Sequence, residues 1–150
     1  MRIHNTVQDS IVDGPGLRYV VFTQGCPHNC PGCHNPETHD PDGGREVPVE
    51  ELIEDMRRNP LTDGLTLSGG EPFLQIDDCV KLAKAAHAKG LNVWCYSGWT
   101  LEELKEMPQA APLLEEIDVL VDGAYVESQR SLSLPWRGSA NQRVIALKQT

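Results

Sequence analysis

The chain has 150 residues, enough for one domain with a substantial hydrophobic core. Its 13 lysines and arginines stand against 22 aspartates and glutamates, which gives a formal net charge of −9. This balance argues against nucleic acid as a partner, because such binding depends on basic side chains that displace counterions from phosphates, and also against an anionic membrane surface. We therefore expect a single domain over residues 1–150 with no nucleic acid and no membrane among its partners.

The amino terminus and the cysteine content both indicate a cytoplasmic protein. Residues 1–5 contain no apolar signal core, and no apolar run approaches the roughly 18 residues of a membrane span. In a cytoplasmic chain, the five cysteines are more often ligands or buried thiols than disulfides. Cys79 and Cys95 stand alone in a helix-like and a strand-like segment, so we expect them to be small buried hydrophobic side chains.

The first half of the chain predicts two strands, each followed by a motif. Residues 17–24 are apolar and β-branched, as in a buried strand, and a cysteine-rich loop follows them. A turn at residues 41–44 precedes residues 49–56, whose apolar side chains have helical spacing. Residues 65–68 form the second predicted strand, which leads directly into Gly69-Gly70-Glu71-Pro72.

The second half continues the alternation of helices and strands. The predicted elements are a helix over 77–89 ended by Gly90, a strand over 91–96, a short helix opened by the Thr100 and Glu103 capping pair, and strands over 117–122 and 143–147. Such alternation predicts right-handed β–α units and a mostly parallel sheet. About five strands are too few for a closed eight-stranded barrel. The expected fold class is α/β, with an open, partial β/α barrel.

Four polar or glycine-rich segments directly follow predicted strands. They are residues 25–34, 68–71, 97–98 and 122–123. In parallel β/α folds, the loops at the carboxyl ends of the strands build the active site. We therefore expect these four segments to lie together on one rim of the sheet.

The first of these segments carries three cysteines, Cys26, Cys30 and Cys33, in a C-x3-C-x2-C pattern. Three thiolates so close in sequence can hold one [4Fe–4S] cluster, for which four cysteines are usual. The iron without a protein ligand is then open to another molecule, as in metal sites that perform chemistry.

Two other interpretations of the cysteine loop remain open. A zinc site would need a fourth ligand, for which His28, His34 and His39 are candidates. A ferredoxin-like electron carrier would need a fourth cysteine, and Cys79 and Cys95 are the two available. Both alternatives describe a metal-binding module rather than an enzyme.

The order of these motifs resembles the radical S-adenosylmethionine superfamily. The resemblance rests on C-x3-C-x2-C after the first predicted strand and on residues 69–72 after the second. Residues 13–18 and 21–27 are similar to the start of glycyl-radical-enzyme activases. Among these, the chain length and residues 96–104 and 136–143 match the activases of anaerobic ribonucleoside-triphosphate reductases, whereas pyruvate formate-lyase activases are longer.

The resemblance implies a radical SAM-type fold and an oxidoreductase activity. Cys26, Cys30 and Cys33 would hold a [4Fe–4S] cluster whose fourth iron binds S-adenosylmethionine, and the cofactor would carry the difficult chemistry. Reductive cleavage would give methionine and a 5′-deoxyadenosyl radical, which abstracts a glycine hydrogen from an anaerobic ribonucleoside-triphosphate reductase. A low-potential donor such as flavodoxin or ferredoxin would supply the electron.

The resemblance also implies a set of residues around S-adenosylmethionine. Gly69 and Gly70 would let the backbone approach its methionine part, and Glu71 would face its amino group through the carbonyl or the carboxylate. The other implied contacts are Gly32, Cys33 and His34 at the adenine, and Tyr96, Ser97 and Asp122 at the ribose or carboxylate. Gly32 stands where many members of the superfamily have an aromatic residue, so no aromatic wall can come from that position.

Two segments of the chain, and the substrate on which the protein acts, each have more than one interpretation. Residues 14–18 form either a tight turn or a surface for the partner protein, with Arg18 helping to position it. Residues 141–143 are either part of the same surface for the partner protein or polar caps at the end of a strand. A pyruvate formate-lyase-type target and a small-molecule radical enzyme are the alternative functions.

Overall fold

A seven-stranded sheet forms the framework of the protein. The computed structural model describes residues 1–28, 36–130, 136–137 and 139–148. Within these residues the strand order is β3-β1-β2-β4-β5-β6-β7. The strands are β1 (Arg2–Ser10), β2 (Arg18–Thr23), β3 (Arg45–Glu46), β4 (Gly64–Gly69), β5 (Asn92–Tyr96), β6 (Val119–Asp122) and β7 (Arg143–Ala146).

The four central strands are parallel and carry the predicted motifs at one end. β2 pairs in parallel with β4, β4 with β5, and β5 with β6. β2 is buried at five of its six positions, as expected for a parallel strand covered on both faces. The outer pairings, β1 with β2, β1 with β3 and β6 with β7, are antiparallel.

All five predicted strands exist, but the expected number of about five is too low. β1 and β3 are not among the predicted strands, and β7 is antiparallel to its neighbour. β1 is rich in polar residues, and only Arg2 and Ile3 of its nine residues pair with β3. Backbone pairing with β2 therefore holds β1 in the sheet, without the apolar signal by which buried strands are recognised.

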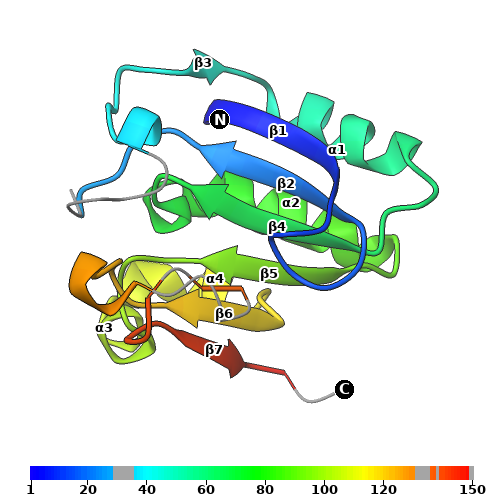
Figure 1. The fold of residues 1–150 in the computed structure, drawn as a ribbon. Helices are drawn as coiled ribbons and strands as arrows, with labels where there is room; N and C mark the ends of the chain where they lie inside the picture. The colour runs from blue at the N-terminus through cyan, green and yellow to red at the C-terminus, as the bar shows by residue number, and fades with distance from the viewer. Residues whose placement is uncertain (29–35, 131–135, 138, 149–150) are drawn as a thin grey trace.

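The α-helices are α1 (Val49–Arg58), α2 (Ile76–Ala88), α3 (Leu101–Lys105) and α4 (Ala111–Leu114), with short 3₁₀ turns η1 (Pro36–Thr38), η2 (Pro72–Leu74), η3 (Pro108–Ala110) and η4 (Glu127–Gln129). In the view of Figure 1, α2 lies behind the central strands, and α3 lies beside the carboxyl end of β6. The predicted capping box is confirmed, because the Thr100 hydroxyl accepts from the Glu103 amide at 3.2 Å while the Glu103 carboxylate accepts from the Thr100 amide at 3.0 Å. None of the described helices is long and apolar enough to cross a membrane.

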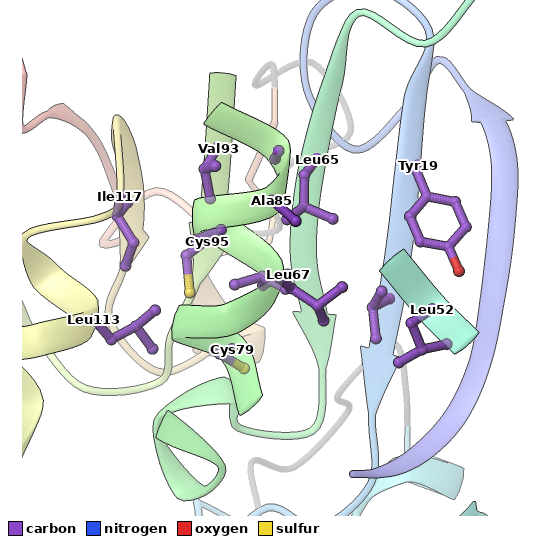
Figure 2. Close-up of a cluster of buried hydrophobic side chains, with 14 of the residues drawn as sticks. Tyr19, Leu52, Leu65, Leu67, Cys79, Ala85, Val93, Cys95, Leu113 and Ile117 are labelled. Atoms are coloured by element: carbon purple, nitrogen blue, oxygen red, sulfur yellow. The ribbon is translucent and has the colours of Figure 1, made fainter. Parts of the chain in front are cut away.

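The hydrophobic core fills the space between the sheet and these helices. Alternate residues of the parallel strands point into it, such as Leu65 and Leu67 of β4 and Val93 of β5 (Figure 2). Cys79 of α2 and Cys95 of β5 belong to this cluster and are fully buried. Burial raises the pKa of both thiols, so the prediction that they are small core side chains is confirmed.

The opposite face of the central strands is covered by the connection between β1 and β2. The Thr66 hydroxyl of β4 points to this face and donates to the Asp13 carbonyl at 2.8 Å. Arg18 lies beneath the same connection with no exposed surface. An added Cβ on Gly14 would lie 2.7 Å from the Arg18 side chain, and one on Gly64 would lie 2.4 Å from its guanidinium. Residues 14–18 therefore form a turn that encloses Arg18 rather than presenting it at the surface.

Candidate functional site

The carboxyl ends of β2, β4, β5 and β6 lie along one rim of the sheet, on the left in Figure 1. Three of the four predicted segments, at residues 68–71, 97–98 and 122–123, lie there in full. The fourth begins there at Gly25, but Cys30, Gly32, Cys33 and His34 lie outside the described residues. The expectation that the motifs share one rim is therefore met for every described part of them.

The start of the cysteine loop is fixed by backbone hydrogen bonds. The Gly25 amide donates to the Thr38 carbonyl at 2.6 Å, and the Cys26 amide donates to the His39 carbonyl at 3.2 Å. The Glu71 amide donates to the Gly25 carbonyl at 2.8 Å. These bonds attach the start of the cysteine loop directly to the motif that follows β4.

Gly69 and Gly70 allow this close approach of two backbones. Gly69 has a φ of +94°, and an added Cβ there would lie 2.4 Å from the Thr23 amide nitrogen. An added Cβ on Gly70 would lie 2.3 Å from the Gly25 carbonyl oxygen. The glycines are thus needed for the contact between the loops, a requirement that the sequence analysis assigned to S-adenosylmethionine alone.

Glu71 has a fully buried carboxylate whose hydrogen bonds all come from the protein. Its Oε1 accepts from the Ser97 hydroxyl at 3.0 Å and from the Gly98 amide at 2.7 Å, and lies 2.6 Å from His28 Nε2. Its Oε2 accepts from the Phe73 amide at 3.2 Å, which caps η2. The carboxylate therefore joins the loops that follow β2, β4 and β5.

The two predicted residues of β5 and its loop have different surroundings. Ser97 is buried, and besides donating to Glu71 it accepts from the Trp99 amide at 3.1 Å. Tyr96 ends β5 on the face opposite the main core. Burial, together with the negative charge of Asp13, raises the pKa of the Tyr96 phenol, so it is a neutral donor at physiological pH.

Asp122 is also buried and already engaged. Its carboxylate accepts from the Leu101 amide at 2.8 Å, which caps α3, and from the guanidinium of Arg143 on β7. Arg143 also donates to Glu102 of α3 at 2.6 Å and 3.0 Å. Asp122 therefore ties β6, β7 and α3 together at the rim.

The segment before β7 holds the loop that follows β6. The Asn141 side chain donates to the Ala124 carbonyl at 2.8 Å, and the Gln142 side chain donates to the Gly123 carbonyl at 3.0 Å. These bonds match the polar-cap alternative for residues 141–143. They fix the path of the chain at the fourth strand end of the rim.

The sequence analysis missed the roles of His28, Gly98 and Trp99. His28 entered only as a candidate zinc ligand, whereas its ring packs edge-on against Trp99, with centroids 4.6 Å apart, and its Nε2 lies beside Glu71. The parallel topology placed a histidine and a carboxylate on adjacent strand ends. Their pairing depends on the path of the loop, which no local pattern in the sequence specifies.

The described part of the cysteine loop fits an iron–sulfur cluster. Cys26 is partly exposed at the rim, and a thiolate is the donor that such clusters use. Within the described residues, no three histidine, cysteine or acidic side chains gather as a separate metal site. That Cys26, Cys30 and Cys33 together hold the cluster stays a prediction, because Cys30 and Cys33 lie outside the described residues.

Comparison with known proteins gives a consistent relationship over nearly the whole chain. The family described as "4Fe-4S single cluster domain" matches residues 12–145. The anaerobic ribonucleoside-triphosphate reductase-activating protein of Escherichia coli K12 is 37% identical over 99% of this chain and 100% of its own length. The proteins of the same name from Vibrio cholerae and phage T4 are 37% and 34% identical, over 95% and 89% of this chain and 96% and 86% of their own lengths.

The solved structures add a likeness of fold. The crystal structure of QueE from Escherichia coli superposes with a TM-score of 0.54 and 16% identity, over 66% of this chain and 53% of that one. At this identity the likeness concerns the α/β fold alone. The iron–sulfur character and the activating-enzyme class predicted from the motifs are confirmed by the family match and the relatives. The chain belongs to the 4Fe-4S single cluster domain family and, within it, to the anaerobic ribonucleoside-triphosphate reductase-activating proteins.

Proposed function

We propose that the protein cleaves S-adenosylmethionine reductively at a [4Fe–4S] cluster and thereby activates an anaerobic ribonucleoside-triphosphate reductase. The chemistry that a bound cluster would supply is one electron that breaks the S–C5′ bond, which releases methionine and a 5′-deoxyadenosyl radical; the radical would take a hydrogen atom from a glycine Cα of the partner and become 5′-deoxyadenosine. Cys26, Cys30 and Cys33 hold the cluster, and the iron without a thiolate receives S-adenosylmethionine.

One observation carries this proposal: the cysteine loop begins in direct contact with the Gly69–Glu71 motif. The Gly25 carbonyl accepts from the Glu71 amide at 2.8 Å, and Gly70 lies too close to that carbonyl for any side chain. A cluster on the cysteine loop and a ligand along the β4 loop are then neighbours. This is the arrangement in which one molecule could bind the open iron and the β4 loop together.

Within the β4 motif, the backbone is the better candidate for binding the methionine amino group. The Glu71 carboxylate already has four protein donors or neighbours, whereas its carbonyl accepts from the Leu74 amide and retains a second lone pair. The backbone of Gly69 and Gly70 would also face the methionine part of S-adenosylmethionine. The remaining proposed contacts are Gly32, Cys33 and His34 at the adenine, and Tyr96, Ser97 and Asp122 at the ribose or carboxylate.

The partner and the setting follow from the family. The sheet, open at β3 and β7 among the described strands, would curve as a partial barrel whose rim admits the glycine-bearing loop of the reductase. The electron would come from a low-potential donor such as flavodoxin or ferredoxin, and the reaction would take place in the cytoplasm. The reductase is proposed as the partner because relatives named as its activating proteins align with this chain over almost their full length.

The cluster assignment is tested by removing one cysteine at a time. Cys26→Ala, Cys30→Ala and Cys33→Ala should each reduce the formation of 5′-deoxyadenosine from S-adenosylmethionine to background, because each removes one of three iron ligands. Cys79→Ala and Cys95→Ala are matched controls, since both thiols lie in the core, and they should retain cleavage. Cleavage by any of the first three variants, or zinc instead of iron after anaerobic reconstitution, would contradict the assignment.

The partner is tested by mixing the reduced protein with candidate glycyl-radical enzymes. The glycyl radical signal in electron paramagnetic resonance should appear with an anaerobic ribonucleoside-triphosphate reductase. A signal with a pyruvate formate-lyase-type enzyme alone would show that the partner is wrong while leaving the cleavage reaction intact.

A further inference from the structure

His28 connects the cysteine loop to the rest of the rim. It lies two residues after Cys26 and two before Cys30, in the segment between two proposed cluster ligands. Its Nε2 lies 2.6 Å from the Oε1 of Glu71, and its side chain is 12% exposed. The same Oε1 accepts from the Gly98 amide, so the arrangement fits the tautomer in which His28 Nε2 carries the hydrogen and donates to Glu71.

The imidazole ring of His28 packs against the loop that follows β5. Trp99 contacts the ring edge-on, with an angle of 75° between the two planes. On another side lies Gly98, where an added Cβ would come within 2.2 Å of the His28 ring. The Gly98 amide and the Ser97 hydroxyl donate to the same carboxylate oxygen that faces His28. The ring is therefore held by the loop after β5 as well as by Glu71.

The contact between His28 and Glu71 adds to the attachment of the cysteine loop. Three thiolates would fix a cluster to this loop, so the contacts of the loop with the rest of the protein would also position the cluster. Backbone hydrogen bonds hold the loop at Gly25 and Cys26, at its start. His28 adds a hydrogen bond to a buried charged acceptor further along the loop, and bonds of this kind are stronger than those between neutral groups.

We propose that His28 is a positioning residue: through Glu71 it fixes the segment between Cys26 and Cys30 against the loops after β4 and β5. A cluster on this loop would thereby keep its position relative to the proposed S-adenosylmethionine site. This inference rests on the proposed function, because it takes the three cysteines as cluster ligands. Residues that orient metal ligands without touching the metal commonly change metal affinity or activity about 10- to 100-fold when they are replaced.

Two variants of His28 separate its hydrogen bond from its bulk. His28→Leu keeps an apolar side chain of similar size but cannot donate. His28→Gln places an amide nitrogen near the position of the imidazole Nε2 and can donate to Glu71. The measurements are the rate at which a chelator removes iron from the anaerobically reconstituted protein, and the S-adenosylmethionine concentration that half-saturates the change in the electron paramagnetic resonance spectrum of the reduced cluster.

His28→Leu should assemble the cluster, because all three thiols remain. It should lose iron about tenfold faster and need about tenfold more S-adenosylmethionine for the spectral change. His28→Gln should stay within about twofold of the unmodified protein in both measurements. His28→Leu behaving like the unmodified protein, or His28→Gln being as impaired as His28→Leu, would overturn the proposal.

His87→Leu is the matched control. His87 of α2 also bonds carboxylates, with Nε2 2.9 Å from Asp118 and Nδ1 3.2 Å from Glu116, but at the opposite end of the sheet. This variant should leave both cluster measurements unchanged, and equal losses would show a general effect of destabilisation and overturn the proposal. If the spectrum of the unmodified protein did not respond to S-adenosylmethionine, the proposed function would fail, and the chelator rates would still test His28 separately.

Discussion

The two ends of the parallel sheet each contain a fully buried charged side chain. Arg18 begins β2 at the amino end, and Glu71 follows β4 at the carboxyl end, and neither has exposed surface. A buried charge is costly unless hydrogen bonds compensate it, so both ends must supply enough partners. The partners come from very different parts of the chain, and this difference separates the structural end of the sheet from the functional one.

Arg18 is held by the strands and by its own turn. Its guanidinium donates to four oxygens, those of Pro15, Leu65, Thr66 and Asn92, and lies 5.6 Å from the centre of a Trp94 ring. Burial lowers the pKa of Arg18 to about 10, so the side chain remains charged at neutral pH. Glu71 instead receives its donors from three loops of the rim, one of which carries the cysteines. A defect at Arg18 should weaken the fold, whereas a defect near Glu71 should misplace the cluster.

The largest effect on stability is expected at the amino end. Arg18→Met keeps most of the side-chain volume but leaves buried oxygens without a donor, each at a cost of about 1–3 kcal/mol. We expect the free energy of unfolding in urea to fall by about 3–5 kcal/mol, because several of these oxygens lose their donor together. The spectrum of the cluster in the presence of S-adenosylmethionine should be unchanged in molecules that remain folded.

Arg18→Lys is the control for charge. Lysine keeps the positive charge but cannot present a planar fork to four oxygens, so the loss of stability should be intermediate. If Arg18→Met unfolded at the same urea concentration as the unmodified protein, the buried charge would not stabilise this end. If it changed the spectrum of the cluster, the separation between the two ends would be wrong.

A smaller loss of stability with a larger effect on the site is expected at Gly70. The Cβ of Gly70→Ala would meet the Gly25 carbonyl, so the β4 motif and the cysteine loop must separate. Overpacking of this kind costs about 1–3 kcal/mol. The S-adenosylmethionine concentration needed for the spectral change should rise, because the two halves of the proposed site have moved apart.

Gly90 provides a control with no such contact. It has a φ of +83° and nothing within 4 Å of an added Cβ, so Gly90→Ala should cost about 1–2 kcal/mol through backbone strain alone. Its cluster should respond to S-adenosylmethionine as in the unmodified protein. An equal shift in both variants would mean that the response follows overall stability and not the contact between the loops.

The comparison also explains how much of the molecule could be predicted. The parallel strands and the helices between them were predictable because their apolar residues recur with the period of each element. The position of the motifs on one rim then followed from the topology of parallel sheets. β1 and β3 were not predicted because neither has the apolar alternation that marks a strand: β1 consists mostly of polar residues, and β3 is only Arg45–Glu46.

The contacts of the buried charges could not be predicted. Residues 14–18 allow a tight turn or a surface for the partner, and the burial of Arg18 depends on glycines at positions 14 and 64 that both lie against its side chain. The resemblance connects Glu71 to S-adenosylmethionine, whereas its carboxylate bonds to the loops after β2 and β5. Its partner His28 comes from another strand end, and such a long-range pairing has no period in the sequence.

The smallest predicted effect concerns the exposed side of the rim. Arg143 donates to Glu102, and this hydrogen bond lowers the pKa of the Glu102 carboxyl to about 2. Because the pKa is lower in the folded state, the contribution to stability is present above the ordinary value of 4.5 and is lost as the pH falls from there towards 2.

In the cluster-free protein, Glu102→Gln should therefore be slightly less stable than the unmodified protein at pH 6, and the difference should disappear near pH 2 and in high salt. Glu106→Gln, at the end of the same helix, removes a charge that has no ion pair among the described residues and should show no such difference. A gap between Glu102→Gln and the unmodified protein that persisted at low pH would mean that packing, not charge, attaches β7 to the rim.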